Sequence, residues 1–179
     1  MVLAGEGNVQ LLFGLIQDTG GVPPELLVPL FVTNAFALAT AGVCFRWPGV
    51  GLWVFRVVFI GAGVFNIRLG IIRPQTYVEG FGELAVFSFY RSFIHGFFQD
   101  HAVIIIVLIS IGQMLVGFLL FTRDWSQRLG MLGGIFFLVA ITPLGIGSAF
   151  PAPLVMAFAL YVLDRRLRAP VPPESPSST

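Results

Sequence analysis

The sequence predicts an all-helical protein that crosses a membrane, and three observations support this fold class. The chain has 179 residues, of which 56% are hydrophobic and only 11% are charged, whereas soluble domains usually carry about 25% charged residues. Its mean hydropathy is +0.91, and a chain this small cannot hide so much apolar surface from water. Cys44 is the single cysteine, which excludes a disulfide scaffold. These observations argue against a soluble enzyme, a disordered protein and a nucleic-acid-binding protein.

Five apolar stretches predict about five transmembrane helices, since a span needs roughly 20 apolar residues to cross about 30 Å of hydrocarbon. We predict spans at 24–45, 50–69, 101–121, 129–146 and from 151 to 163 or beyond. The fifth is short, because residues 149–163 cover only about 22 Å at about 1.5 Å per residue. Either the glycine-rich turn before it dips below the membrane surface, or Asp164 and the arginines after it continue the helix and snorkel to the head groups.

Arginine placement predicts the orientation of these spans, because cytoplasmic loops carry an excess of basic residues. If the N-terminus is outside, the inner side collects Arg46, Arg123, Arg128, Arg165, Arg166 and Arg168. The stretch before residue 24 has no basic residue. We therefore expect an integral protein of a bacterial inner membrane, with its N-terminus outside and its C-terminus in the cytoplasm.

The chain divides into three parts on composition. Residues 1–23 form an outer-side segment, residues 24–168 form the transmembrane bundle, and residues 169–179 form an inner-side tail rich in proline and serine. Within the bundle, residues 75–100 are interfacial. Apolar residues in 83–99 recur at intervals of three and four, which predicts a helix lying flat on the outer leaflet. Its role stays open between a lid over the bundle and a plain membrane-interface helix.

Few side chains in this sequence are suited to hold a ligand. Arg56, Asn66 and Gln113 fall inside predicted spans, where polar groups are costly. They either bridge helices through hydrogen bonds or line the pocket of a quinone head group. His95 and His101 lie on the outer side, where they could ligate a pigment or haem, although no metal-ligand spacing is present. No nucleophile motif accompanies them, so we expect no catalytic residue and no metal centre.

Small residues in the predicted spans favour close helix packing. Gly130 and Gly134 form a GxxxG motif. Other predicted spans also carry glycines, at Gly61, Gly63, Gly112 and Gly117.

Two apolar stretches are similar to segments of a known family. FRVVFIGAGVFN at 55–66 resembles the opening span of the DoxX/DoxD-like membrane proteins, and GQMLVGFLL at 112–120 resembles a later span, with Gln113 where a glutamate is common. The resemblance extends over residues 55–163. It implies a four-helix core, to which the span at 24–45 is an addition, and a link to quinone-coupled redox complexes.

We expect a non-catalytic accessory or scaffolding subunit of a larger energy-transducing membrane complex, respiratory or photosynthetic, whose partners are the lipid bilayer and other membrane subunits. One alternative is a DoxX-like, quinone-interacting redox subunit with Arg56, Asn66 and Gln113 near the head group. The other is a lipid- or pigment-binding protein that uses His95 or His101. The cofactors considered are accordingly quinone, lipid and (bacterio)chlorophyll, and no nucleic acid is expected as a partner.

Overall fold

The computed structural model describes residues 24–82 and 88–168, and within these ranges the regular structure is helical, with no strand. The helices are α2 (Pro24–Arg46), α3 (Pro48–Ile72), α4 (Gln75–Gly82), α5 (Ser88–Phe93), η1 (Ile94–Phe98), α6 (Ala102–Leu119), α7 (Asp124–Ile141), η2 (Thr142–Ser148) and α8 (Ala152–Leu167). This confirms the all-helical prediction for the described part of the chain. The predicted outer segment at 1–23, the tail at 169–179 and residues 83–87 lie outside it.

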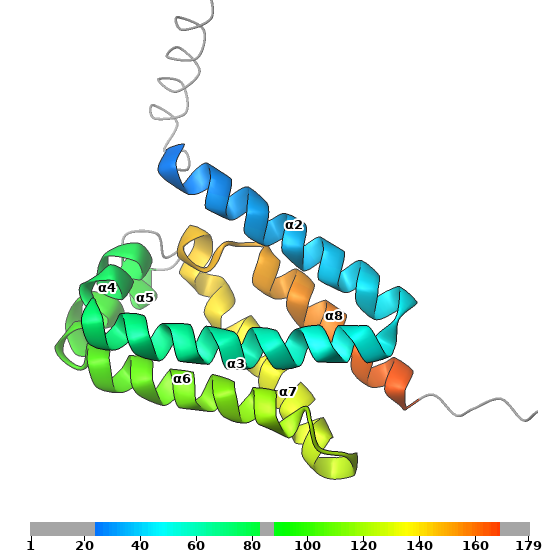
Figure 1. Ribbon diagram of the computed structural model, residues 1–179. Coiled ribbons are helices and arrows are strands. Elements are labelled where there is room, and N and C mark those ends of the chain that lie inside the picture. Colours follow the sequence, from blue (N-terminus) through cyan, green and yellow to red (C-terminus); the bar gives the residue numbers. More distant parts are fainter. Residues whose placement is uncertain (1–23, 83–87, 169–179) are drawn as a thin grey trace, which may run out of the picture.

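The five longest helices form an up-and-down bundle (Figure 1). α2, α6 and α8 run in one direction, and α3 and α7 run in the other. α3 packs along α6, α2 packs along α8, and α7 contacts both α6 and α8. As a result, α2, α6 and α8 end, and α3 and α7 begin, at the same end of the bundle.

Four segments of the described chain are long and apolar enough to cross a membrane, namely Leu26–Arg46, Pro48–Ile72, Ala102–Leu119 and Asp124–Ser148. They correspond to the first four predicted spans. α8 has 16 residues and is about 24 Å long at about 1.5 Å per residue, less than the hydrocarbon thickness. A fifth crossing therefore stays a prediction.

The fourth of these segments differs from the prediction at both ends. α7 begins at Asp124 rather than at 129, and its N-terminal dipole favours the acidic side chain in the first turn. At the other end, the α-helix stops at Ile141 and a 3-10 helix, η2, continues to Ser148. Gly145 has φ of 64° there, a left-handed conformation that glycine adopts without steric cost.

The interfacial segment is divided, whereas its periodicity predicted one flat helix over 83–99. A separate helix, α4, precedes that range, and α5 passes into η1, which is a π-helix. Gly96 lies within η1 with φ of −104° and ψ of −109°, outside the helical region. Gly96 thus interrupts the regular helix within this segment, and α4, α5 and η1 lie together at one end of the bundle (Figure 1).

Buried side chains form two clusters. The larger includes Phe55, Phe59, Leu120 and Leu160 and lies among α2, α3, α6, α7 and α8. The smaller ties the interfacial helices to the start of α6 through Val78, Ile94, Phe98, Ala102 and Ile106. The second cluster therefore fixes the interfacial helices against the bundle.

Glycines at helix contacts allow the main chains to approach closely, as the sequence predicts. A Cβ atom on Gly117 would lie 2.5 Å from Ile60 Cγ1, and one on Gly134 would lie 2.7 Å from Leu160 Cδ2. Gly112 faces open space, with no atom within 4 Å of such a Cβ.

Candidate functional site

A cavity of about 410 Å³ lies between the interfacial helices and the end of the bundle where α3 ends and α6 begins. Its wall is contributed by α3, α4, α5, η1, α6, α7 and η2. Ligand sites for small molecules span about 300–1,000 Å³ and are mainly apolar. The described lining fits that pattern, with Phe81, Phe93, Ile105, Ile109 and Phe137 among its members.

Three polar side chains meet in one wall of this cavity. The Tyr77 hydroxyl of α4 donates a hydrogen bond to Asn66 Oδ1 of α3 at 2.8 Å. Asn66 Nδ2 in turn donates to Gln113 Oε1 of α6 at 2.8 Å. All three residues line the cavity, so the network joins three helices and also presents polar atoms to whatever occupies the space.

One amide of this network stays free. Gln113 is only 6% exposed, and its Nε2 has no hydrogen-bond partner in the part of the chain that the structure describes. Within that same part, no fully buried side-chain nitrogen or oxygen lacks a partner. Gln113 Nε2 must therefore be accessible, and the accessible space beside Gln113 is the cavity.

The other polar members of the lining use their hydrogens locally. The Ser110 hydroxyl donates to the Ile106 carbonyl at 2.6 Å, and the Ser148 hydroxyl donates to the Gly145 carbonyl at 2.9 Å. The Tyr90 hydroxyl lies 3.5 Å from the carbonyl of Ala140. The free polar hydrogens that the described lining offers are thus those of amides.

Tyr77 remains a hydrogen-bond donor at neutral pH. Its helix, α4, lies outside the four candidate spans. Burial raises the pKa of the Tyr77 hydroxyl above its ordinary value, because the phenolate form would lose its hydration. The hydroxyl therefore keeps its proton and holds Asn66 in place.

Arg56 is remote from this network, although the sequence grouped it with Asn66 and Gln113 around one head group. Asn66 lies ten positions after Arg56 in α3, which is about 15 Å along the helix. Arg56 Nε donates to the carbonyl of Leu120 at 2.9 Å, and its guanidinium lies 4.5 Å from the Phe121 ring centroid. Arg56 thus satisfies a carbonyl at the C-terminal end of α6, where the last turn lacks partners of its own. The structure brings two of these three residues together and separates the third.

The two histidines also lie apart from the cavity. His95 is exposed in η1. His101 is exposed as well, with Nδ1 3.0 Å from the carbonyl of Phe97 and its ring 4.6 Å from the Phe97 ring. Neither belongs to the described lining. Within the described ranges, no group of three or more His, Cys, Asp or Glu side chains is placed to hold a metal ion.

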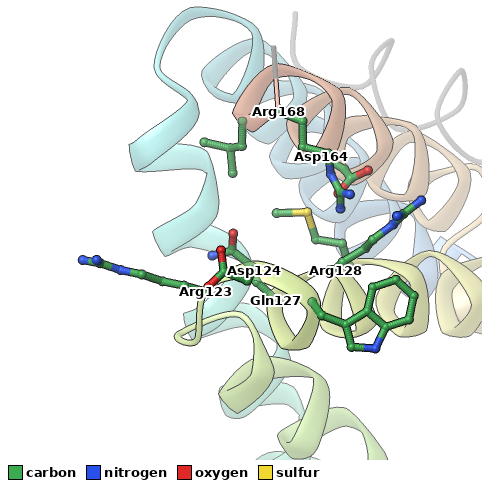
Figure 2. A pocket seen from close by; sticks show the side chains of 9 residues that line it. Arg123, Asp124, Gln127, Arg128, Asp164 and Arg168 are labelled. Atoms are coloured by element: carbon green, nitrogen blue, oxygen red, sulfur yellow. The ribbon is translucent and has the colours of Figure 1, made fainter. Parts of the chain in front are cut away.

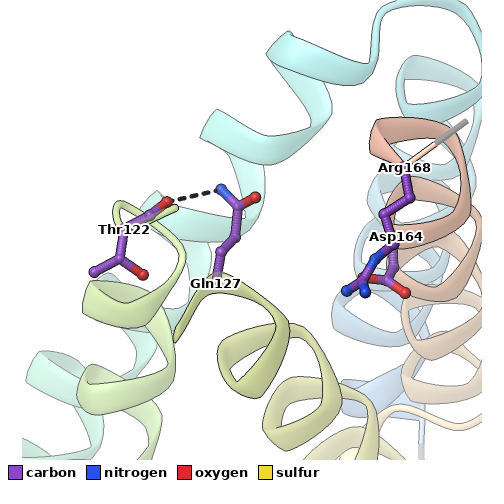
Figure 3. A network of polar contacts seen from close by, with 4 residues as sticks. All are labelled: Thr122, Gln127, Asp164 and Arg168. Carbon is purple, nitrogen blue, oxygen red and sulfur yellow. Dashed lines mark hydrogen bonds and ion pairs between the residues drawn. The ribbon is translucent and has the colours of Figure 1, made fainter. Parts of the chain in front are cut away.

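A second, polar hollow of about 430 Å³ lies at the opposite end of the bundle, between the start of α7 and the end of α8. Its residues are Arg123, Asp124, Trp125, Gln127, Arg128, Met131, Asp164, Leu167 and Arg168. Figure 2 shows that the Arg123 side chain extends away from the hollow. Figure 3 shows Gln127 Nε2 donating to the carbonyl of Thr122, at 3.0 Å, and Arg168 beside its ion-pair partner Asp164. The side chains of Gln127, Asp164 and Arg168 therefore make their contacts within the bundle itself.

The sequence analysis missed Tyr77 and the interfacial helices as parts of the cavity. Tyr77 lies in a short segment between a proline and a glycine, so its only signal was an aromatic hydroxyl next to a predicted membrane edge. Its partnership with Asn66 depends on how α4 folds back on α3. No local pattern in the sequence reports that contact.

Comparisons with known proteins give no relative for this chain. It matches no protein-family model, no curated protein and no solved structure. The resemblance to the DoxX-like family, the place in a larger complex and the protein partners therefore stay predictions.

Proposed function

We propose that this protein is membrane-embedded and binds a lipophilic small molecule in the cavity beneath its interfacial helices, with a quinone as the leading class. The observation that carries the proposal is the Tyr77–Asn66–Gln113 network, which presents a free amide to an otherwise apolar cavity. Sites for small molecules combine an apolar wall with a few placed polar groups that orient the ligand. A network that served only to join helices would have no need to leave an amide facing open space.

The border of the cavity supports entry from the lipid phase. Two large apolar side chains of the described lining are exposed, Ile109 at 43% and Phe93 at 40%. Both are large and apolar, so they suit contact with acyl chains rather than water. A ligand dissolved in the bilayer would pass between such side chains without exposing its tail to solvent.

The placement of the interfacial helices favours a lid among the two roles that the sequence left open. α4, α5 and η1 contribute Tyr77, Tyr90 and Phe98 to the cavity wall. The second apolar cluster holds the same helices against α6. An interfacial helix that only rested on the head groups would need neither contact.

We also propose five crossings of a bacterial inner membrane, with α8 as the fifth and the N-terminus outside. Arg46, Arg123 and Arg166 belong to the end of the bundle where α2 and α8 finish and α7 starts, which suits a cytoplasmic surface. The cavity then lies in the outer half of the membrane. In this arrangement α3, α6, α7 and α8 would form the four-helix core of the DoxX-like resemblance, with α2 added to it.

Reporter fusions test this topology. Green fluorescent protein fused after Arg168 should fluoresce, and alkaline phosphatase fused at the same position should be inactive, because the C-terminus would be cytoplasmic. A phosphatase fused within the α4–α5 connection should be active. Phosphatase activity at both positions would contradict five crossings.

Retention of a lipophile by the purified protein tests the binding function. The wild-type protein is purified in mild detergent, and bound molecules are extracted and identified by mass spectrometry. Ala140 is an exposed residue of the lining, so Ala140→Phe should fill the mouth and abolish retention. Val139→Phe is the matched control, because Val139 is 49% exposed and outside the lining. Equal retention by the two variants would refute the proposed site.

A further inference from the structure

We infer that the molecule bound in this cavity has a neutral head group that accepts hydrogen bonds, such as the carbonyl of a ketone, an ester or a quinone. Purely apolar and anionic counterparts bind less tightly. This inference rests on the proposed binding function and names the chemistry of its ligand.

The direction of the hydrogen-bond network sets the polarity of the site. Tyr77 donates to Asn66 Oδ1, and Asn66 Nδ2 donates to Gln113 Oε1. Each amide oxygen therefore already accepts one hydrogen bond. Asn66 accepts through its oxygen and donates through its nitrogen. The last member, Gln113, is left with an NH₂ group that faces the cavity. An amide NH₂ can only donate, so its natural partner on a ligand is an oxygen that accepts.

A neutral hydroxyl head group also fits this wall. Its oxygen can accept from Gln113. Its hydrogen can find an acceptor, because the amide oxygens of Asn66 and Gln113 each hold one hydrogen bond and have a second lone pair. The site therefore selects for an oxygen that accepts a hydrogen bond and does not distinguish a carbonyl from a hydroxyl.

An anionic head group is disfavoured by charge. In the described ranges, 24–82 and 88–168, the lining contains no arginine, histidine, aspartate or glutamate. Arg68 and Arg73 line a different hollow, beside Phe65 and Ile72. An unpaired carboxylate or phosphate moved into such surroundings loses hydration and gains no counter-charge.

Four straight-chain probes of equal length isolate the head group, because they share one tail. They are a methyl ketone, a primary alcohol, a carboxylic acid and an alkane. Each is added in radiolabelled form to the purified protein in lipid nanodiscs, and binding to empty nanodiscs is subtracted. We expect the ketone and the alcohol to bind more tightly than the alkane, by roughly two- to tenfold, which is the effect of one net hydrogen bond. At neutral pH the acid should bind most weakly.

Two variants locate the effect. Gln113→Leu should remove the advantage of the ketone and keep the binding of the alkane, which also reports that the cavity is intact. Thr142→Val is the control, because the Thr142 hydroxyl donates to the Leu138 carbonyl at 2.9 Å and Thr142 is not part of the lining. It should preserve the order of all four probes.

The outcomes separate the inference from the function on which it rests. Equal affinity for ketone and alkane in the wild-type protein, or tightest binding of the acid, would overturn the inference and leave a lipophile site in place. Failure of every probe to bind would overturn both. If Gln113→Leu does not fold, the order of the four probes on the wild-type protein still decides.

Discussion

Replacing Gly63 by alanine tests whether the close approach of α3 to α6 stabilises the bundle. A Cβ atom at position 63 would lie 2.5 Å from Met114 Cγ and 2.8 Å from the backbone oxygen of Ser110. The methionine side chain can move, but the carbonyl belongs to a helix and cannot. The two helices must therefore separate. At Gly61, two residues earlier, a Cβ atom would have nothing within 4 Å.

The comparison of Gly63→Ala with Gly61→Ala isolates the effect of packing. Both variants replace glycine within the same helix, so both gain the same helix propensity, about 1 kcal/mol. That gain cancels in the difference between them. What remains is the cost of inserting a methyl group into a filled contact, typically about 1–3 kcal/mol. Gly63→Ala should be less stable than Gly61→Ala by about that amount.

Reversible unfolding provides the measurement. Each variant is unfolded in mixed micelles of a mild detergent and sodium dodecyl sulfate, and helix content is followed by circular dichroism. The facing helix offers an independent pair. Gly117→Ala should be destabilising because its Cβ would lie 3.1 Å from the backbone nitrogen of Ile60, whereas Gly112→Ala should not. Equal free energies of unfolding within both pairs would show that α3 and α6 do not pack as described.

Two further predictions concern polar side chains at opposite ends of the bundle. Arg56→Ala should destabilise the protein by about 1.5–3 kcal/mol, the usual value for a hydrogen bond to a charged group, and exposed Arg128→Ala should have little effect in the same unfolding assay. Because burial raises the pKa of Tyr77, its hydrogen bond to Asn66 should stabilise the fold below the pKa of the unfolded chain and be lost as the pH rises through the folded pKa. An ultraviolet titration that compares wild-type protein with Tyr77→Phe should show Tyr77 ionising at a higher pH than a tyrosine of the unfolded chain. Ionisation of Tyr77 at the unfolded value would contradict its burial.

The long apolar helices could be predicted from local signals in the sequence. The predicted span at 24–45 corresponds to Pro24–Arg46, and the one at 101–121 corresponds to Ala102–Leu119. Runs of apolar residues ended by arginine, proline or glycine mark such helices whatever surrounds them. The glycines that permit close packing were only partly identifiable. Gly63, Gly117 and Gly134 lie at helix contacts, whereas Gly61 and Gly112 face open space.

Only part of the candidate site could be predicted from the sequence. The sequence singled out Asn66 and Gln113 because polar groups in a span need a reason to be there. Their hydrogen bond joins residues 47 positions apart, and Tyr77 joins it only because α4 folds back on α3. Gly96 divides the interfacial segment through its backbone conformation, which the apolar periodicity does not report.

The amino-acid sequence was sufficient to establish the helical class and the apolar segments, since length and composition along the chain decide both. The faces that the helices turn to one another, and hence the cavity and the network that joins Tyr77, Asn66 and Gln113, are decided only by the tertiary structure. In a membrane protein, the side chains that face lipid are as apolar as those that face a neighbouring helix. Hydropathy therefore reveals that a helix exists without revealing which side of it is buried.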